Sequence, residues 1–389
     1  MLALGGAALA SPKQTTAERR SSLFPYYAGF SEAFVRDVLD ALQATADQVV
    51  LDPWNGSGTT TTVVKQAGLN SIGIDLNPAM AVVAKARLST QRNIAEARQL
   101  LNESGRHLSQ KFLRHACCSP YSSATRSSLL LAVFRLTRKR LRDQDRMATN
   151  PTWWQLSRSE VMQAVASISK SQLDNELTEI GTKISIGNSG TNKVNLIRGD
   201  LLASNLERVT ADIIITSPPY LTRIDYVKAT LPELLVLSLL EDFSFDDLRR
   251  SMIGSPVIGR GPDCMPRDIG DYAKSLLSQI AAHDSKASAT YYLAFFSAYI
   301  SKMFAAFEKL NSIARPGARM VMVVQGSHYK EVFVDLPRLS VDFAKSVGFD
   351  LVSRADFNFK QSFAQLNPRA NGYSLDNAQE TALLFRRPL

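Results

Sequence analysis

The sequence has few cysteines and no long hydrophobic run. Its three cysteines, Cys117, Cys118 and Cys264, have no metal-ligand spacing and form no disulfide framework, so we expect no metal site and a reducing cytoplasm. No apolar run reaches membrane-spanning length, and we expect no membrane partner. The apolar start of the chain lacks the basic residues that open a signal peptide. We therefore interpret residues 1–22 as a flexible lead-in.

Positive charge is in excess, with a net charge of +9 and an isoelectric point near 9.4. Such a balance favours a polyanionic partner, although a merely basic surface remains an alternative. Residues 91–190 contain 15 Lys and Arg against 8 Asp and Glu, so most of the excess lies in this segment. The length of 389 residues suggests either one core with large insertions or two domains.

A glycine-rich turn follows the first predicted strand, Gln48 to Asp52, and precedes a predicted helix that ends near Ala67. The turn reads Pro-Trp-Asn-Gly-Ser-Gly-Thr-Thr, and its glycines let a ligand approach the backbone while the helix start offers free N–H groups. It lacks the Gly-Lys-Ser/Thr ending of a nucleotide P-loop. Asp75 ends the next predicted strand, where a carboxylate can accept hydrogen bonds from ribose hydroxyls.

A second motif ends the segment Ala-Asp-Ile-Ile-Ile-Thr-Ser-Pro-Pro-Tyr, residues 211–220. The isoleucines predict a strand buried on both faces, and the two prolines stop it and restrict the backbone. A stiff corner at the carboxyl end of a strand is where open α/β sheets bind ligands. The hydroxyl of Ser217, a fixed carbonyl and the ring of Tyr220 could together hold a planar base that carries an amino group.

Two segments interrupt the alternating strands and helices of the core, which we assign to residues 23–90, 191–240 and 291–389. Residues 91–190 predict a basic helical insertion, with helices over residues 129–142 and 159–173. Basic residues beside aromatic ones suit contacts with nucleic acid, although a solvated charged face is the alternative for each of them. The candidate nucleic-acid-binding residues are Arg135, Arg138, Lys139, Arg140 and Arg142. Residues 241–290 predict a loop-rich insertion over the site and are the second candidate for target recognition.

The two motifs, with Asp75 between them, resemble those of S-adenosylmethionine-dependent DNA amino-methyltransferases of restriction–modification systems, which methylate cytosine N4 or adenine N6. The resemblance implies a class I methyltransferase (Rossmann-like) α/β fold, with seven mostly parallel strands, a reversed last hairpin and helical insertions. It implies catalytic residues that hold the base: Ser217, Pro218, Pro219 and Tyr220. It implies residues around S-adenosylmethionine, with Asp75 at the ribose and Asp200 near the adenine: Tyr27, Phe30, Asp52, Asn55, Gly56, Ser57, Gly58, Thr59, Asp75 and Asp200.

Ser217 bears on the choice of base. In the family that this chain resembles, Ser-Pro-Pro-Tyr usually accompanies cytosine-N4 methylation and Asp-Pro-Pro-Tyr adenine-N6 methylation. We therefore expect methylation of cytosine N4 in flipped-out bases of double-stranded DNA, with a cognate restriction endonuclease acting on the same site as an implied partner. Adenine-N6 methylation, base methylation of RNA and a non-catalytic nucleic-acid-binding protein remain the alternatives.

Overall fold

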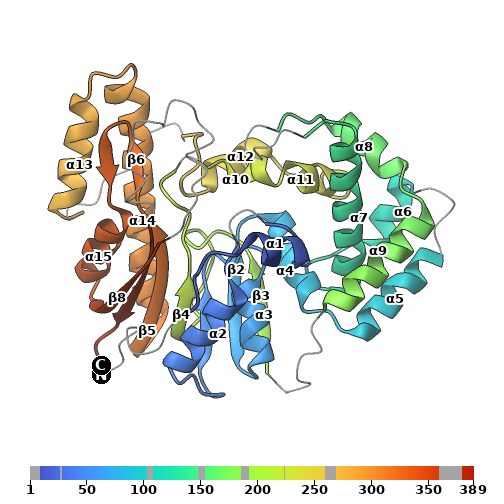
Figure 1. Cartoon of the computed structure of the whole chain (residues 1–389), viewed down its shortest axis with the longest axis horizontal. Coiled ribbons are helices and arrows are strands. Elements are labelled where there is room, and N and C mark those ends of the chain that lie inside the picture. The colour runs from blue at the N-terminus through green and yellow to red at the C-terminus, as the bar shows by residue number, and fades with distance from the viewer. Residues whose placement is uncertain are drawn as a thin grey trace.

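A seven-stranded sheet lies at the centre of the computed structural model, which describes residues 9–26, 29–102, 108–147, 154–184, 192–222, 224–258, 269–358 and 379–389. The strand order is β3-β2-β1-β4-β5-β9-β8, shown in Figure 1. Its strands are β1 (Val49–Asp52), β2 (Asn70–Asp75), β3 (Val194–Arg198), β4 (Ala211–Thr216), β5 (Ala314–Gln325), β8 (Asp350–Asn358) and β9 (Gln379–Arg386). Strand β9 runs antiparallel to both of its neighbours, and the other pairings are parallel. The predicted sheet with a reversed hairpin at its end is confirmed.

The register of the central strands brings the two predicted motifs together. Strand β1 pairs with β2 on one side and with β4 on the other, where Val50 lies opposite Ile213. All three strands are parallel, so their carboxyl ends meet at one edge of the sheet. Asp52, Asp75 and Ser217 stand at or directly after these ends. The two motifs therefore lie at the same edge of the sheet.

Helices cover both faces of the sheet. Helices α2 (Glu32–Ala41) and α3 (Thr59–Gln66) pack on a face that includes Ile213 and Ile215. Helices α14 (Leu293–Ile313) and α15 (Leu336–Ser346) pack on a face that includes Ile214 and Met320. Helix α4 (Pro78–Arg87) contributes to a third cluster together with the helical insertion. The alternation of the isoleucines between two clusters explains why β4 is apolar on both sides.

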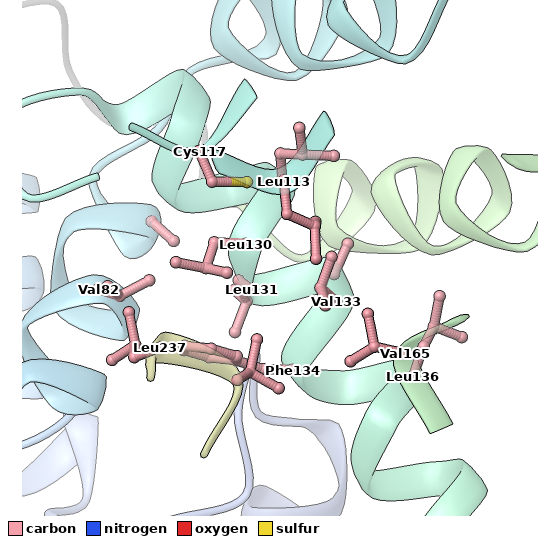
Figure 2. Close-up of a cluster of buried hydrophobic side chains, with 14 of the residues drawn as sticks. Val82, Leu113, Cys117, Leu130, Leu131, Val133, Phe134, Leu136, Val165 and Leu237 are labelled. Atoms are coloured by element: carbon pink, nitrogen blue, oxygen red, sulfur yellow. The ribbon is translucent and has the colours of Figure 1, made fainter. Parts of the chain in front are cut away.

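The insertion is a helical bundle beside the sheet. It consists of α5 (Gln91–Asn102), α6 (Gln110–Ala116), α7 (Ala124–Asp143), α8 (Arg158–Ala166) and α9 (Lys170–Lys183). Helix α7 is buried on all sides between Ser127 and Phe134, because the other helices surround it. Figure 2 shows its side chains meeting Val82 of α4, Val165 of α8 and Leu237 of α11 (Leu231–Leu237). The bundle shares one hydrophobic core with α4 and α11 and is anchored to the sheet domain through them.

Several predicted elements differ from the structure. The single helix expected at residues 159–173 is two helices, because Ser169 starts α9 with a capping box. Residues 241–290 are not loop-rich throughout, since they contain α12 (Phe245–Ser251) and α13 (Asp271–Ala282). The flexible lead-in expected at residues 1–22 contains α1 (Thr16–Ser21), and Lys13 forms a β-bridge with Phe30.

Four further elements complete the described part of the chain: α10 (Tyr226–Ala229), a π-helical turn η2 (Ser288–Tyr292) before α14, and the hairpin of β6 (Ser327–Tyr329) and β7 (Val332–Val334). Short elements of this kind give little periodic signal in a sequence. Among the described residues, no helix combines the length and apolar character that crossing a membrane requires.

Candidate active site

The glycine-rich turn after β1, residues 53–60, is called the cradle here because its backbone is the expected place for a ligand. Gly56 and Gly58 have φ values of +50° and +85°, in the left-handed region that other residues rarely adopt. A Cβ atom on Gly58 would lie 2.7 Å from the Cβ of Ala84, so only glycine lets α4 approach the turn. Helix α3 begins directly after Gly58, and its first N–H groups face the edge of the sheet.

Asp52 at the end of β1 is a buried carboxylate that joins the two motifs. Its Oδ1 atom accepts hydrogen bonds from Thr216 Oγ1 at 2.7 Å and from the Trp54 amide at 3.2 Å. Burial raises the pKa of Asp52 to about 6, although hydrogen bonds act in the opposite direction. Thr216 directly precedes the Ser-Pro-Pro-Tyr corner, so this contact fixes the corner against the cradle.

Asp75 at the end of β2 lies on the other side of the cradle. Its Oδ2 atom accepts the Gly56 amide at 2.6 Å, and its Oδ1 atom accepts the Asn77 amide at 2.8 Å. Burial raises the pKa of Asp75 to about 6, and the nearby charge of Asp52 adds a smaller effect in the same direction. The buried Asp52 and the half-buried Asp75, both with raised pKa values, create a region that favours a cationic or hydroxyl-bearing ligand.

Asn55 holds the turn over β2. A Cβ atom on Gly73 of β2 would come within 2.6 Å of the Asn55 side chain, so the glycine makes room for it. The Oδ1 atom of Asn55 accepts a hydrogen bond from Thr61 Oγ1 at 3.1 Å. Asn55 is therefore a structural part of the cradle, and no contact of its side chain with a ligand is needed to explain its position.

Asp200 lies next to Asp75, as the adjacent strands require. The Gly199 amide donates to the carbonyl oxygen of Asp75 at 2.9 Å, and Asp200 Oδ1 accepts the Leu202 amide in a local turn. This position agrees with an expected place near the adenine of the cofactor. The contact itself stays a prediction.

The aromatic segment before α2 differs from the prediction. Phe30 packs against Phe34 of α2 with ring centroids 5.7 Å apart, in the cluster under the helix. Tyr27 lies outside the described residues. Tyr26 instead faces the cradle, because a Cβ atom on Gly56 would lie 3.3 Å from its ring. Burial raises the pKa of the Tyr26 phenol, and the charge of Asp75 raises it further. The sequence marked the segment but not this residue.

The Ser-Pro-Pro-Tyr corner is held by hydrogen bonds that involve the phenol groups of Tyr220, Tyr226 and Tyr299. Ser217 Oγ donates to the phenol oxygen of Tyr220 at 3.0 Å, so the lone pairs of the serine oxygen can still accept a hydrogen. Tyr299 of α14 donates to the Pro219 carbonyl at 2.7 Å, and the Tyr220 amide donates to Tyr226 at 3.4 Å. Burial raises the pKa of Tyr220 far above its usual value, so the phenol is neutral.

Sequence reasoning missed Tyr226 and Tyr299. Both are ordinary aromatic residues in apolar helical patterns, and Tyr299 is 80 positions from the carbonyl that it contacts. The contact exists only because α14 packs beside β4, which no local pattern reveals. Gly254 completes this packing, since a Cβ atom there would lie 3.3 Å from the Tyr220 carbonyl and its φ is +75°.

The predicted nucleic-acid-binding residues have two different environments. Arg138 is buried and forms a two-pronged ion pair with Glu233 of α11 at 2.6 and 2.9 Å, and it stacks on Phe24 and Trp154. Arg135 pairs with Glu176 and Glu179 of α9. These arginines bind other parts of the protein, and the prediction that Arg138 presents its charge to nucleic acid is wrong.

The remaining basic residues of α7 lie nearer the surface. Arg140 donates to Gln172 at 3.3 Å and is half-buried, while Lys139 and Arg142 are exposed. Only these last two have the accessibility that a phosphate contact requires. Within the described part of the chain, no cluster of three or more His, Cys, Asp or Glu residues could hold a metal ion.

The groups of the cradle fit S-adenosylmethionine, the cofactor that the resemblance implies. The hydroxyl of Thr59, at the start of α3, is buried and has no hydrogen-bond partner among the described residues. The ring of Tyr26 lies against Gly56, and within the described part of the chain each carboxylate oxygen of Asp75 accepts one hydrogen bond from the protein. An unsatisfied hydroxyl, an aromatic ring beside the turn and carboxylates with spare acceptor capacity fit a ligand with hydroxyl groups and a positive charge.

Comparison with known proteins agrees with this site. A family model described as DNA methylase matches residues 9–86, which include the cradle and Asp75. Type II methyltransferase M.BsoBI of Geobacillus stearothermophilus is 22% identical in an alignment 440 residues long, which covers 93% of this chain and 84% of that protein. Type II methyltransferase M.ScaI of Streptomyces caespitosus is 34% identical over 82 residues, or 21% of this chain and 27% of that protein.

Solved structures overlap more loosely. The rRNA methyltransferase aviRa from Streptomyces viridochromogenes has a TM-score of 0.34 at 12% identity, covering 97% of this chain and 96% of that chain. The glycopeptide N-methyltransferase MtfA in complex with sinefungin also has a TM-score of 0.34, at 8% identity, covering 94% and 96%. The fold follows from the strand order itself. The family match and the relatives, together with the cradle and the Ser-Pro-Pro-Tyr corner, support an S-adenosylmethionine-dependent DNA amino-methyltransferase.

Proposed function

We propose that the protein transfers a methyl group from S-adenosylmethionine to the exocyclic N4 atom of cytosine in duplex DNA. The observation that carries this proposal is the hydrogen bond from Thr216 to Asp52, which holds the Ser-Pro-Pro-Tyr corner directly beside the cradle. A methyl donor in the cradle and an amino-bearing base in the corner would be neighbours. Such positioning supplies much of the rate in a reaction between two bound groups.

The corner is suited to an amino group. The lone pair of an exocyclic amine is delocalised into the ring, so the amine is a poor nucleophile. Ser217 Oγ and the Pro218 carbonyl would accept the two amino hydrogens and favour a pyramidal nitrogen whose lone pair points to the methyl group. Tyr299 and Tyr226 both hold the peptide group that joins Pro219 to Tyr220, so little reorganisation is needed when a base arrives. Tyr220 would stack on the base.

The bound cofactor supplies an electrophilic methyl group on a positively charged sulfur. Asp52 and Asp75 would hold that charge and the ribose hydroxyls, with Thr59, Gly56, Ser57 and Gly58 lining the turn around the methionine part and Asp200 near the adenine. The target base has to leave the DNA duplex to reach the corner, because its amino group is otherwise paired within the helix.

Cytosine is preferred over adenine because Ser217 stands where the adenine enzymes of the resembled family usually have aspartate. The relative M.BsoBI is named a Type II methyltransferase, which supports the proposal that this protein is a Type II modification enzyme. A restriction endonuclease that cuts the same site is the partner that this role implies. Adenine-N6 methylation uses the same corner and is the second candidate, favoured by a family model that is not specific to one base.

The test is methyl transfer from labelled S-adenosylmethionine to duplex DNA, followed by digestion to nucleosides. We expect label in N4-methyl-2′-deoxycytidine, a loss of about 100-fold or more in rate for Ser217→Ala, and a similar loss for Tyr220→Ala. Ser278→Ala, an exposed serine of α13, is the matched control and should keep the wild-type rate. Label in N6-methyl-2′-deoxyadenosine would show that adenine is the target instead of cytosine. Incorporation that survives both corner variants would refute the assignment of the site.

A further inference from the structure

Glu380 is a buried carboxylic acid that the proposed reaction has not yet used. It is the second residue of β9 and pairs with Gln325 of β5 and with Phe357 of β8. Strand β9 is antiparallel, so its start lies at the same edge of the sheet as the carboxyl ends of the parallel strands. The residue is 8% exposed, and its Oε2 atom has no hydrogen-bond partner among the described residues. A buried oxygen without a partner is costly and calls for an explanation.

The side chain of Glu380 points to the same face of the sheet as the corner, with β5 between β9 and β4. Ala382 and Leu384 of β9 belong to the same cluster as Ile213 and Ile215 of β4, and side chains alternate along a strand. Glu380 lies two positions before Ala382 on β9, and Ser217 lies two positions after Ile215 at the end of β4. The two side chains therefore share one face of the sheet. The charge of Glu380 is, after burial, the largest influence that raises the pKa of Tyr220. The acid thus lies within electrostatic reach of the corner.

We propose that the carboxylate of Glu380 accepts the proton that the target amino group loses during methyl transfer. This inference rests on the proposed function. The amine lone pair forms the new bond to the methyl carbon, and the breaking carbon–sulfur bond leaves its electron pair on sulfur, which becomes neutral. The nitrogen then carries the positive charge and releases one proton, which Glu380 takes up to become a neutral acid. The acid later returns the proton to solvent, and the balance closes without another reactant.

The electrostatic surroundings of Glu380 suit this role. Burial raises the pKa of Glu380 to about 7, and Lys13 of the N-terminal segment lowers it by its positive charge. Among the described residues, the titratable groups with which it interacts electrostatically are Lys13 and Tyr220. An acid whose two forms are both present near neutral pH exchanges protons efficiently. The alternative role is purely structural, in which Glu380 serves only as the ion-pair partner that holds Lys13.

Single-turnover methylation of duplex DNA at saturating cofactor, followed from pH 5.5 to 9, separates these roles. We expect the wild-type rate to rise with pH through about 7, since the protonated acid cannot accept a proton. Glu380→Gln should be about 100-fold or more slower and should lack this rise, while its affinity for S-adenosylmethionine stays within about threefold of wild type. Lys13→Met should move the rise to higher pH, because the pKa of Glu380 is no longer lowered. Glu207→Gln, an exposed acid, is the control and should behave as wild type.

Three outcomes would overturn the inference, and they differ from one another. A Glu380→Gln enzyme with the wild-type rate and the same rise would remove Glu380 from the reaction. If Glu380→Gln and Lys13→Met lose stability and cofactor affinity equally, and the methylation rate still rises with pH in both, then Glu380 serves only as the ion-pair partner of Lys13. A wild-type protein that binds S-adenosylmethionine but labels no DNA would refute the proposed function itself, and with it this inference.

Discussion

Asp52 and Asp75 are carboxylates kept at the edge of the sheet at a cost to stability. Both have pKa values raised to about 6, mainly by burial. Folding therefore favours their protonated forms, and this contribution to stability is complete below pH 4 and is lost as the pH rises through 6. A residue retained at such a cost is expected to be needed for binding, which agrees with a cradle for a positively charged cofactor.

Replacing Asp52 by asparagine should separate stability from binding. The amide keeps the shape and can still accept from Thr216 and Trp54, so we expect the free energy of unfolding at pH 8 to rise by about 1–3 kcal/mol. The difference should shrink toward zero near pH 4, where the native carboxyl is protonated. Binding of S-adenosylmethionine should weaken at least about tenfold, because the negative charge is gone. Urea unfolding at both pH values and calorimetric titration measure the two effects.

Asp40→Asn, an exposed acid of α2, is the matched control and should change neither quantity. A loss of stability in Asp52→Asn at pH 8 would contradict the burial argument. Unchanged cofactor affinity would show that the cradle does not use this carboxylate.

At the scale of elements, the pair of Arg138 and Glu233 joins the bundle to the core. Arg138 lies on α7 and Glu233 on α11, and the glutamate is fully buried. Burial raises the pKa of Glu233, whereas the charge of Arg138 lowers it. Such a pair stabilises little in net terms, but removal of one partner leaves a buried charge.

Arg138→Met should therefore destabilise the protein by about 3–5 kcal/mol in urea unfolding. The double variant Arg138→Met with Glu233→Leu should recover much of this loss, since neither charge remains. Lys139→Met, the exposed neighbour on the same helix, should change stability by less than about 0.5 kcal/mol. A double variant as unstable as the sum of the single ones would show that the two residues do not act as a pair.

The same element shows where prediction from sequence succeeds and fails. The basic run on α7 predicted a helix correctly, because its apolar residues recur at helical spacing. It did not predict which arginine is buried, because the partner Glu233 is 95 positions away. Likewise, the cradle and corner were readable because glycine and proline impose local backbone geometry. Tyr226, Tyr299 and Glu380 were not, because only tertiary packing brings ordinary residues to the site.

At the scale of the whole molecule, part of the positive charge is paired within the protein and part is accessible to a partner. The sequence has a net charge of +9, yet Arg135 and Arg138 are neutralised within the protein. Lys139 and Arg142 remain exposed on the last turns of α7. Figure 1 shows this helix on the far side of the molecule from α15, with the sheet between them. The side of the molecule formed by the bundle thus carries these two accessible basic groups.

We expect Lys139 and Arg142 to contact the DNA backbone, as part of a target-recognition role for the bundle. Replacing both with glutamate should weaken binding to all duplex sequences, and the slope of log affinity against log salt should fall by about one for each lost phosphate contact. Lys345→Glu on α15 is the control on the opposite side, and its effect is compared with that of Lys139→Glu alone, because each of these changes replaces one positive charge with one negative charge. Binding measured by fluorescence anisotropy over a range of salt tests this. If Lys345→Glu lowers the slope of log affinity against log salt as much, only the net charge matters. If no variant lowers the slope, DNA binds elsewhere, and residues 241–290 are the next surface to test.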